Sequence, residues 1–332
     1  MKFIHVGDAH LGAMKDKLRA KEIWATLKKI IKVAKDVDLL MFCGDIFHRQ
    51  PLLSELKELN YLFSTIPNTE VVLIAGNHDF ISEESYYKTF NWNDNVHFIK
   101  SDTVSSIYLE NIKTTVYGAS YHTREIKENI YEGIKAKGKG INILMAHGGD
   151  EAHIPFDKNA LLNAGFDYVA LGHIHKPEIF ADGRMAYAGG IEPLDINDIG
   201  DRGYILGEIG KHLRIEFVRA CKRIYIPIKI ECDESFTNEQ LIDIVSDEIA
   251  KKGKENIYKV IINGIRDLQT EFDLGSIKRL GNIESILDET ITELDYEKIL
   301  AENENNIIGE FIRTIGDTDE KALYYGVKAL WS

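Results

Sequence analysis

Five short apolar runs, each followed at once by metal-binding types of side chain, most constrain how this chain can fold. The runs are Phe3–Val6, Leu39–Cys43, Val71–Ala75, Ile141–Ala146 and Tyr168–Leu171. Their length is too short for core helices, and glycine or polar residues bound them, which is typical of strands buried on both faces. Because the carboxyl ends of parallel strands lie along one edge of a sheet, we expect the residues beyond these runs to converge.

The side chains that follow the runs are those of a metal centre. In chain order they are Asp8, His10, Asp45, His48, Asn77, His78, His147, His173 and His175. A set of carboxylate, amide and imidazole groups without a thiolate suits manganese, iron or zinc. So many ligands are too many for one ion, and they predict two divalent ions that share a ligand. Such a pair clamps a phosphate and lowers the pKa of a bound water.

The remaining pattern predicts an α/β fold in which a two-sheet β-sandwich is flanked by helices. Apolar spacing predicts helices over Arg19–Lys35, Pro51–Thr65 and about Glu125–Lys135. Alternating residues between Val96 and Ser120 indicate strands of a second sheet. We therefore expect one large domain over residues 1–220.

Beyond residue 220 the pattern changes to a small β-α-β unit. It comprises a strand over Arg223–Glu231, a helix over Asn238–Lys252 and a strand over Ile257–Asn263. This predicts a smaller α+β capping domain over residues 221–294. Residues 295–332 are expected to be helical, and the last helix, Asp317–Trp331, would pack on the cap or on a partner.

Composition narrows the classes of partner. The 332-residue chain has a net charge of −13, which argues against holding nucleic acid mainly by a broad basic surface. The acidity is concentrated in residues 221–332, with 14 basic against 23 acidic side chains. The chain starts directly in a strand, has no membrane-length apolar run and has three cysteines, from which we expect a cytoplasmic protein without a signal peptide.

Histidines outside the strand ends are expected to have different roles. His5, His97 and His212 stand alone in the sequence, and isolated histidines are more often structural than catalytic. His122 and His153 are predicted to lie in loops near the edge of the site, where substrate contact is the less frequent role.

The motifs GDAH, GDIFH, GNHD, HG and GHIH, in this order, resemble the calcineurin-like metallophosphoesterase superfamily. Within it, GDIFH is similar to the SbcD-type nuclease subunits and the YhaO-type DNA repair exonucleases. The segment YAGGIEPLDINDIGDRGYILGEI also resembles a block of these proteins, and differs from it at Ala188 and Gly190, where the block has proline and serine.

This resemblance implies a metallophosphoesterase fold and a role for each site residue. One ion, usually manganese, would be held by Asp8, His10, Asp45 and His175. The other would be held by Asp45, Asn77, His147 and His173, so that Asp45 bridges the two. His78 would be the general acid that protonates the leaving oxygen, with Asp79 orienting it, and His48 would stabilise charge on the phosphate.

Three functions remain open at this point. The leading one is a metal-dependent DNA exonuclease of repair or recombination, because His48 replaces the aspartate found in many phosphatase members. A phosphodiesterase acting on a small nucleotide is the second. The third is a subunit that binds DNA ends and an SbcC-like coiled-coil ATPase while cutting little. A homodimer is a further expected assembly, and a membrane is not an expected partner.

Overall fold

The protein is described by a computed structural model, which describes residues 1–180, 183–267, 270–292, 294, 296–316 and 319–331. The chain divides into two compact units, Met1–Tyr225 and Ile226–Ser332. The finer division at residues 220 and 294 stays a prediction. Across the described residues, no helix combines the length and apolar character needed to cross a membrane.

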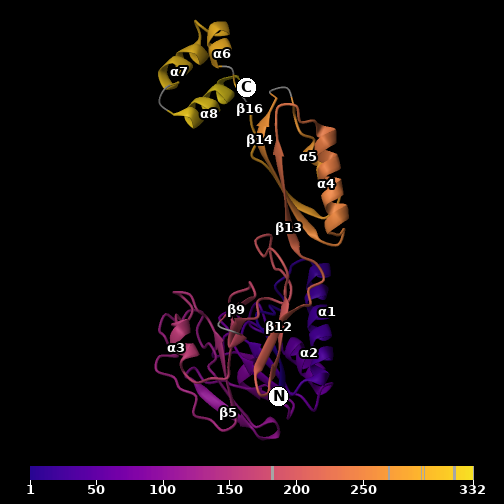
Figure 1. The fold of residues 1–332 in the computed structure, drawn as a ribbon, viewed down its shortest axis with the longest axis vertical. Helices are drawn as coiled ribbons and strands as arrows, with labels where there is room; N and C mark the ends of the chain where they lie inside the picture. The colour runs from indigo at the N-terminus through magenta and orange to yellow at the C-terminus, as the bar shows by residue number, and fades with distance from the viewer. Residues whose placement is uncertain (181–182, 268–269, 293, 295, 317–318, 332) are drawn as a thin grey trace. The chain divides into compact units, whose positions relative to one another are not determined.

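The first unit contains two six-stranded mixed sheets, whose strands run in colour from indigo through magenta toward orange in Figure 1. The first sheet has the order β12-β11-β1-β2-β3-β4, and its strands are β1 (Lys2–Val6), β2 (Leu39–Cys43), β3 (Glu70–Ile74), β4 (Val96–Phe98), β11 (Gly203–Ile209) and β12 (Leu213–Arg219). The second has the order β5-β6-β7-β8-β10-β9, and its strands are β5 (Ser105–Leu109), β6 (Thr114–Gly118), β7 (Ile141–His147), β8 (Tyr168–Gly172), β9 (Glu178–Phe180) and β10 (Met185–Tyr187).

Strands β1 to β4 are parallel, as are β6, β7, β8 and β10, while the outer strands β5, β9, β11 and β12 run antiparallel to their neighbours. The predicted α/β class with two sheets flanked by helices is confirmed. The five apolar runs are thus divided between two sheets, three in the first and two in the second.

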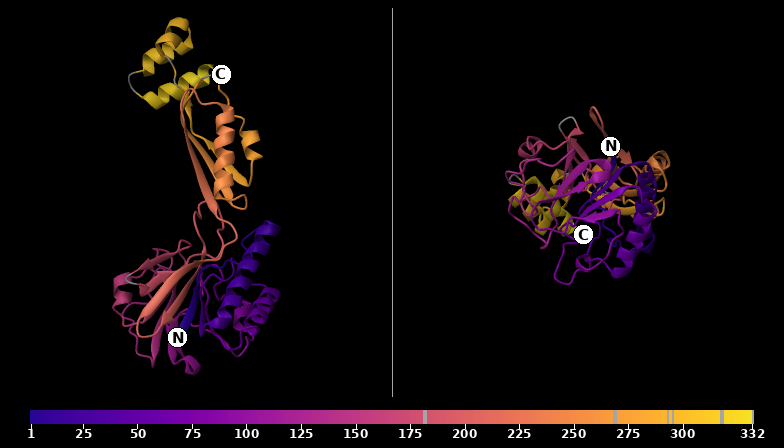
Figure 2. Two further views of the ribbon diagram at one scale, coloured as in Figure 1. Left: turned by 45° about the vertical axis from the view of Figure 1, so that its right-hand side comes forward. Right: turned by 90° about the horizontal axis from the view of Figure 1, so that it is seen from below.

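Strand β2 is apolar at every position because both of its faces are buried. Leu39 and Met41 belong to the core between the two sheets, while Leu40 and Phe42 belong to the core beneath the helices. Successive side chains of a strand point to opposite faces, so a strand covered on both faces must be apolar at every position. Figure 2 shows the two indigo helices, Lys17–Val33 and Leu53–Ser64, on one side of the first unit.

The helices of the first unit are α1 (Lys17–Val33), α2 (Leu53–Ser64) and α3 (Lys158–Leu162), with 3-10 turns η1 (Ala34–Asp36), η2 (Tyr86–Lys88) and η3 (Glu110–Ile112). Helix α1 begins after Asp16, whose carboxylate accepts from two backbone N–H groups of the first turn. Pro51 precedes α2 and does not lie in its first turn, contrary to the prediction.

The helix predicted over about 125–135 does not form. Ile126 instead pairs with His153 as an isolated bridge, and Gly133 takes a left-handed backbone with φ of 70°. A long-range backbone contact has therefore overridden the local helical pattern in this segment.

A buried histidine joins the two sheets. His5 Nε2 donates to the carbonyl of Leu171 (3.1 Å), and its Nδ1 lies 2.9 Å from the hydroxyl of Tyr168. Complete burial lowers the pKa of His5 to about 3, so the ring is neutral and accepts from the hydroxyl. The predicted structural role of this histidine agrees with these contacts.

The second unit contains a small sheet and three terminal helices. Its elements are β13 (Tyr225–Cys232), α4 (Asn238–Lys252), β14 (Ile257–Arg266), α5 (Leu274–Lys278), β15 (Ile283–Asp288), β16 (Ile291–Thr292), α6 (Tyr296–Glu302), α7 (Ile307–Ile315) and α8 (Glu320–Trp331). Helices α4 and α5 share a core with the sheet. Leu323 and Val327 of α8 are buried against Ile299 of α6 and Ile312 of α7, so this face of the last helix packs on its neighbouring helices.

Candidate metal centre

The predicted ligands come together where the carboxyl ends of strands from both sheets meet. Loops after β1, β2 and β3 supply residues from the first sheet, and the last residue of β7 and the loop after β8 supply residues from the second. Among the described residues, four groups have ligand atoms within 4.8 Å of one another. Two of them contain Asp8: Asp8, His10 and His175, and Asp8, Asp45 and His147. Most of these side chains are almost fully buried, and charged groups are rarely buried unless they are paired.

Asp45 lies at the centre of the site. Its Oδ2 is 3.6 Å from His10 Nε2 and 3.4 Å from His147 Nε2, and its Oδ1 accepts from the backbone N–H of His78 (2.8 Å). Burial would raise the pKa of this carboxyl, but the imidazoles of His147, His10 and His78 outweigh burial and hold the pKa well below its usual range. Asp45 therefore stays ionised between histidines from both sheets.

The backbone around Asp45 is tightly constrained. Gly44 and Asp45 have positive φ values of 84° and 48°, so the strand turns sharply at its end. A Cβ on Gly76 would lie 2.2 Å from Asp45 Oδ1, and one on Gly44 would lie 2.4 Å from His147 Nδ1. Both glycines are needed for the approach of the ligands.

His147 is oriented by the backbone of the opposite sheet. Its Nδ1 donates to the carbonyl of Cys43 (2.8 Å), which turns Nε2 toward Asn77 Oδ1 (2.9 Å) and Asp45. Burial disfavours a charged ring, yet the carboxylates of Asp45 and Asp8 raise the pKa of His147 to about 9. The negative charge of Asp45 and Asp8 thus favours a proton on His147. A divalent cation bound among the same side chains would balance this charge in place of the proton.

A second observation also fits a cation. His10 Nε2 lies 3.0 Å from His175 Nε2, and burial lowers the pKa of His10 to about 3. Two imidazole nitrogens that face each other, with Asp8 and Asp45 beside them, form a donor set suited to a divalent transition metal.

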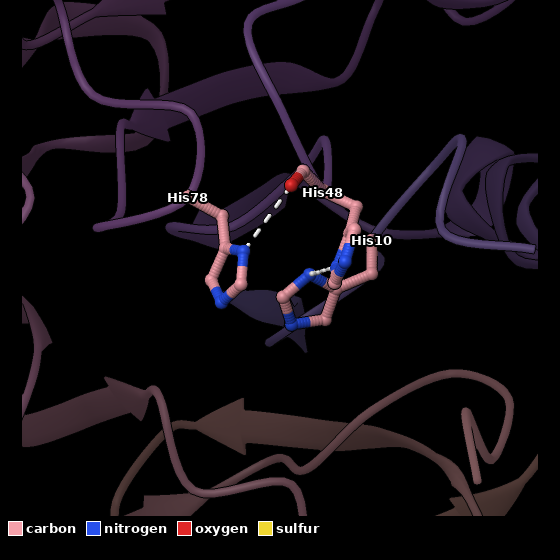
Figure 3. Close-up of side chains that lie close together, drawn as sticks. All are labelled: His10, His48 and His78. Atoms are coloured by element: carbon pink, nitrogen blue, oxygen red, sulfur yellow. Dashed lines mark hydrogen bonds between the residues drawn. The ribbon is translucent and has the colours of Figure 1, made fainter.

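His48 and His78 lie together on the more accessible side of this cluster (Figure 3). Their rings stack with centroids 4.7 Å apart, and His48 Nδ1 is 3.3 Å from His10 Nδ1. His78 Nδ1 donates to the carbonyl oxygen of His48 (3.2 Å). Burial and the neighbouring His78 ring lower the pKa of His48.

Asp79, which is expected to orient His78, makes no hydrogen bond to the His78 ring among the described hydrogen bonds. Asp79 is fully buried and accepts from the backbone N–H of Gly76 (2.8 Å), that of Phe47 (3.1 Å) and the hydroxyl of Tyr87 (2.8 Å). Its carboxylate satisfies buried donors and so fixes the loop that carries Asn77 and His78. Burial and the charge of Asp45 raise the pKa of Asp79 to about 7.

The Nε2 atom of His173 contacts Asp150, a residue outside the predicted ligand set. This nitrogen lies 2.6 Å from Asp150 Oδ2, although the His173 ring centroid is only 5.2 Å from that of His147. Asp150 and His153 form a further group with it. His153 contacts Asp150, and His122 contacts the carbonyl of Lys100 (2.6 Å).

Two residues of the site were missed from the sequence. Asp150 follows the HGG segment by one position, and Asp198 lies in the loop after β10, where its Oδ2 is 3.6 Å from His175 Nδ1. Asp150 is three residues from His147, a signal that proximity to a predicted ligand could have provided. Nothing in the local sequence distinguishes Asp198 from the neighbouring Asp195 and Asp201.

Several basic side chains of the first unit, clustered near residue 220 and on α1, are paired with carboxylates. Lys222 and Arg223 both pair with the buried Glu22, and Arg219 pairs with Asp201. On α1, Lys28 pairs with Glu58 of α2 at 3.0 Å. These ion pairs neutralise much of the positive charge of the clusters.

This fold and donor set define a metal-dependent phosphoester hydrolase. The family described as calcineurin-like phosphoesterase matches residues 1–177, and the chain belongs to it.

Relatives of known name extend the similarity beyond the matched region. The chain is 28% identical to the uncharacterised metallophosphoesterase YhaO of Bacillus subtilis, over 80% of this chain and 72% of the relative. It is 29% identical to the DNA double-strand break repair protein Mre11 of Methanocaldococcus jannaschii, over 89% of this chain and 85% of the relative. Mre11 of Sulfolobus acidocaldarius is 26% identical over 97% of this chain and 92% of the relative.

Proposed function

We propose that this protein is a DNA exonuclease that depends on two divalent ions, manganese in the active form, and acts in the cytoplasm in DNA repair or recombination. The observation that carries the proposal is the pair of stacked imidazoles, His48 and His78, on the accessible side of the ligand cluster. A neutral or cationic ring at position 48 does not repel a phosphodiester, whereas a carboxylate there would.

The ligands are assigned as two sets that share Asp45. The first ion would be held by Asp8, His10, Asp45 and His175, and the second by Asp45, Asn77, His147 and His173. When bound, the ions supply positive charge that binds the phosphate and lowers the pKa of the attacking water. The contacts of Asp45 with His10 and His147 support its role as the shared ligand.

His78 is the general acid of the proposed reaction. Its Nδ1 donates to a carbonyl oxygen, so Nε2 is the nitrogen that can give a proton to the leaving oxygen. His48 packs against this ring and stabilises charge on the phosphate. Asp79 acts on the loop backbone and holds His78 in position without contacting the ring.

Two features support DNA as the substrate. The similarity to proteins named for DNA double-strand break repair spans both units of the chain. The neutralised basic clusters leave the metal centre as the main expected source of positive charge for a phosphate. An SbcC-like ATPase and a second copy of the chain are the proposed protein partners.

Cleavage assays test this proposal directly. Purified protein with Mn²⁺ should degrade linear duplex DNA, and His78→Ala should lower the rate by about 10²–10⁴-fold. His212→Ala, an exposed histidine in the turn between β11 and β12, is the matched control and should keep full activity. Cleavage of bis-p-nitrophenyl phosphate without degradation of DNA would refute the nuclease and favour a small phosphodiester. If the protein binds DNA but does not cleave it with any divalent metal, the result would favour the end-binding subunit.

A further inference from the structure

Asp150 contacts the first histidine of the GHIH segment from outside the predicted ligand set. Its Oδ2 accepts from His173 Nε2 at 2.6 Å. Its Oδ1 accepts from the backbone N–H groups of Ala152 and His153, both at 2.9 Å, and from His153 Nδ1 at 2.9 Å. The carboxylate is therefore held by its own loop, which points its other oxygen at His173.

Asp198 contacts the second histidine of the same segment. Its Oδ2 lies 3.6 Å from His175 Nδ1 and accepts from the backbone N–H of Leu194 (2.8 Å). Its Oδ1 accepts from Arg202 at 3.2 Å. On the other side of the ring, His175 Nε2 faces His10 Nε2.

The two carboxylates thus lie next to different ring nitrogens of two histidines that are two positions apart. Asp150 lies next to Nε2 of His173, and Asp198 lies next to Nδ1 of His175. A carboxylate accepts and does not donate, so His173 Nε2 donates its proton to Asp150 at 2.6 Å. Asp198 Oδ2 is an ion-pair partner at 3.6 Å, and its negative charge favours the proton on His175 Nδ1. His173 is left with Nδ1 as its free lone pair, and His175 with Nε2.

We propose that Asp150 and Asp198 are positioning residues that fix His173 and His175 in opposite tautomers, so that one ring offers Nδ1 and the other Nε2 to the two ions. The inference rests on the two-ion assignment of the proposed function. It explains why His173 lies beside His147 while its Nε2 is directed toward the loop after β7. A carboxylate behind a histidine ligand fixes the ring and increases its basicity, and its loss typically weakens metal binding about 10–100-fold.

The test is metal titration of three variants by calorimetry with Mn²⁺. Asp150→Asn should weaken one of the two binding events about 10–100-fold and leave the other unchanged, and Asp198→Asn should weaken the other event. The effect of Asp150→Asn should be larger because its contact is 2.6 Å against 3.6 Å. Glu151→Gln, an exposed neighbour with the same change of charge, is the control and should bind both ions as the parent does.

A spectroscopic measurement separates positioning from general loosening of the fold. In metal-free protein at alkaline pH, long-range ¹H–¹⁵N correlation spectra distinguish the two tautomers of a neutral imidazole. His173 should give the Nε2–H signature and His175 the Nδ1–H signature, and each should become a mixture only in its own variant. The side chain of Asp150 is 44% exposed, so Asp150→Asn is expected to fold.

Three results would overturn the inference. They are parental affinity for both ions in both variants, the same tautomer for both rings, and a third bound ion that is lost in His153→Ala, which would make Asp150 a ligand. None of these measurements uses DNA, so they do not depend on nuclease activity. Protein that binds two ions as expected but cleaves no DNA would therefore refute the proposed nuclease and leave this inference intact.

Discussion

Replacing Asp79 by alanine tests whether this carboxylate holds the loop or the catalytic ring. The change removes the acceptor of three buried donors, namely two backbone N–H groups and the Tyr87 hydroxyl. Each unpaired buried donor costs about 1–3 kcal/mol. Relief of the repulsion between Asp79 and Asp45 offsets part of this, so we expect a net loss of about 2–4 kcal/mol in the free energy of unfolding.

The assay is urea unfolding in EDTA, followed by tryptophan fluorescence. Trp24 and Trp92 lie in the first unit, so a Trp331→Phe background restricts the signal to that unit. The midpoint and slope give the free energy by linear extrapolation. His78→Ala is the matched comparison, and because His78 is partly exposed its loss should change stability by less than about 1 kcal/mol.

A double-mutant cycle with Tyr87→Phe sharpens the test. The Tyr87 hydroxyl donates to Asp79 Oδ2 at 2.8 Å, so the two substitutions should be coupled by about 1–2 kcal/mol. If Asp79→Ala unfolds at the parental midpoint while cleavage falls as in His78→Ala, the carboxylate acts on the ring and the structural reasoning is refuted.

Three further predictions concern the metal site and the ion pairs of Glu22 in the first unit. Gly76→Ala should abolish binding of Mn²⁺ in calorimetry, because its Cβ would lie 2.2 Å from Asp45 Oδ1; parental binding would show that the turn can relax. Saturating Mn²⁺ should raise the melting temperature over that in EDTA, since an ion that binds only the folded state adds about 2.7 kcal/mol at 100 times its dissociation constant; an unchanged temperature would contradict a metal centre. Burial would raise the pKa of Glu22, but Arg19 and Arg223 outweigh it and lower that pKa, so its ion pairs stabilise the fold above pH 4.5 and this contribution is lost as pH falls below that value. In Glu22→Gln, the acid-induced loss of stability below pH 4.5 should be smaller than in the parent, and an identical pH profile would exclude this contribution.

The parts of the fold that followed local rules were predictable. The five apolar runs could be predicted as strands because a strand that is covered on both faces is apolar at every position. The helix predicted over Asn238–Lys252 has those bounds in the structure. The segment over about 125–135 failed because its backbone pairs with a loop near residue 153, a contact that no local pattern encodes. Similarly, the role expected of Asp79 came from the family resemblance, while its hydrogen-bond partners include Phe47 and Tyr87.

The sequence by itself determined which side chains stand at the strand ends, because the apolar runs and the residues beyond them are properties of the chain. Only the tertiary structure decided how those side chains are used. It placed three strand ends in one sheet and two in the other, and it set His147 against a carbonyl 104 positions away. It also placed Asp150 next to Nε2 of His173 and Asp198 next to Nδ1 of His175. The direction of an imidazole nitrogen depends on its partner across the fold, and that partner is fixed only when both sheets have packed.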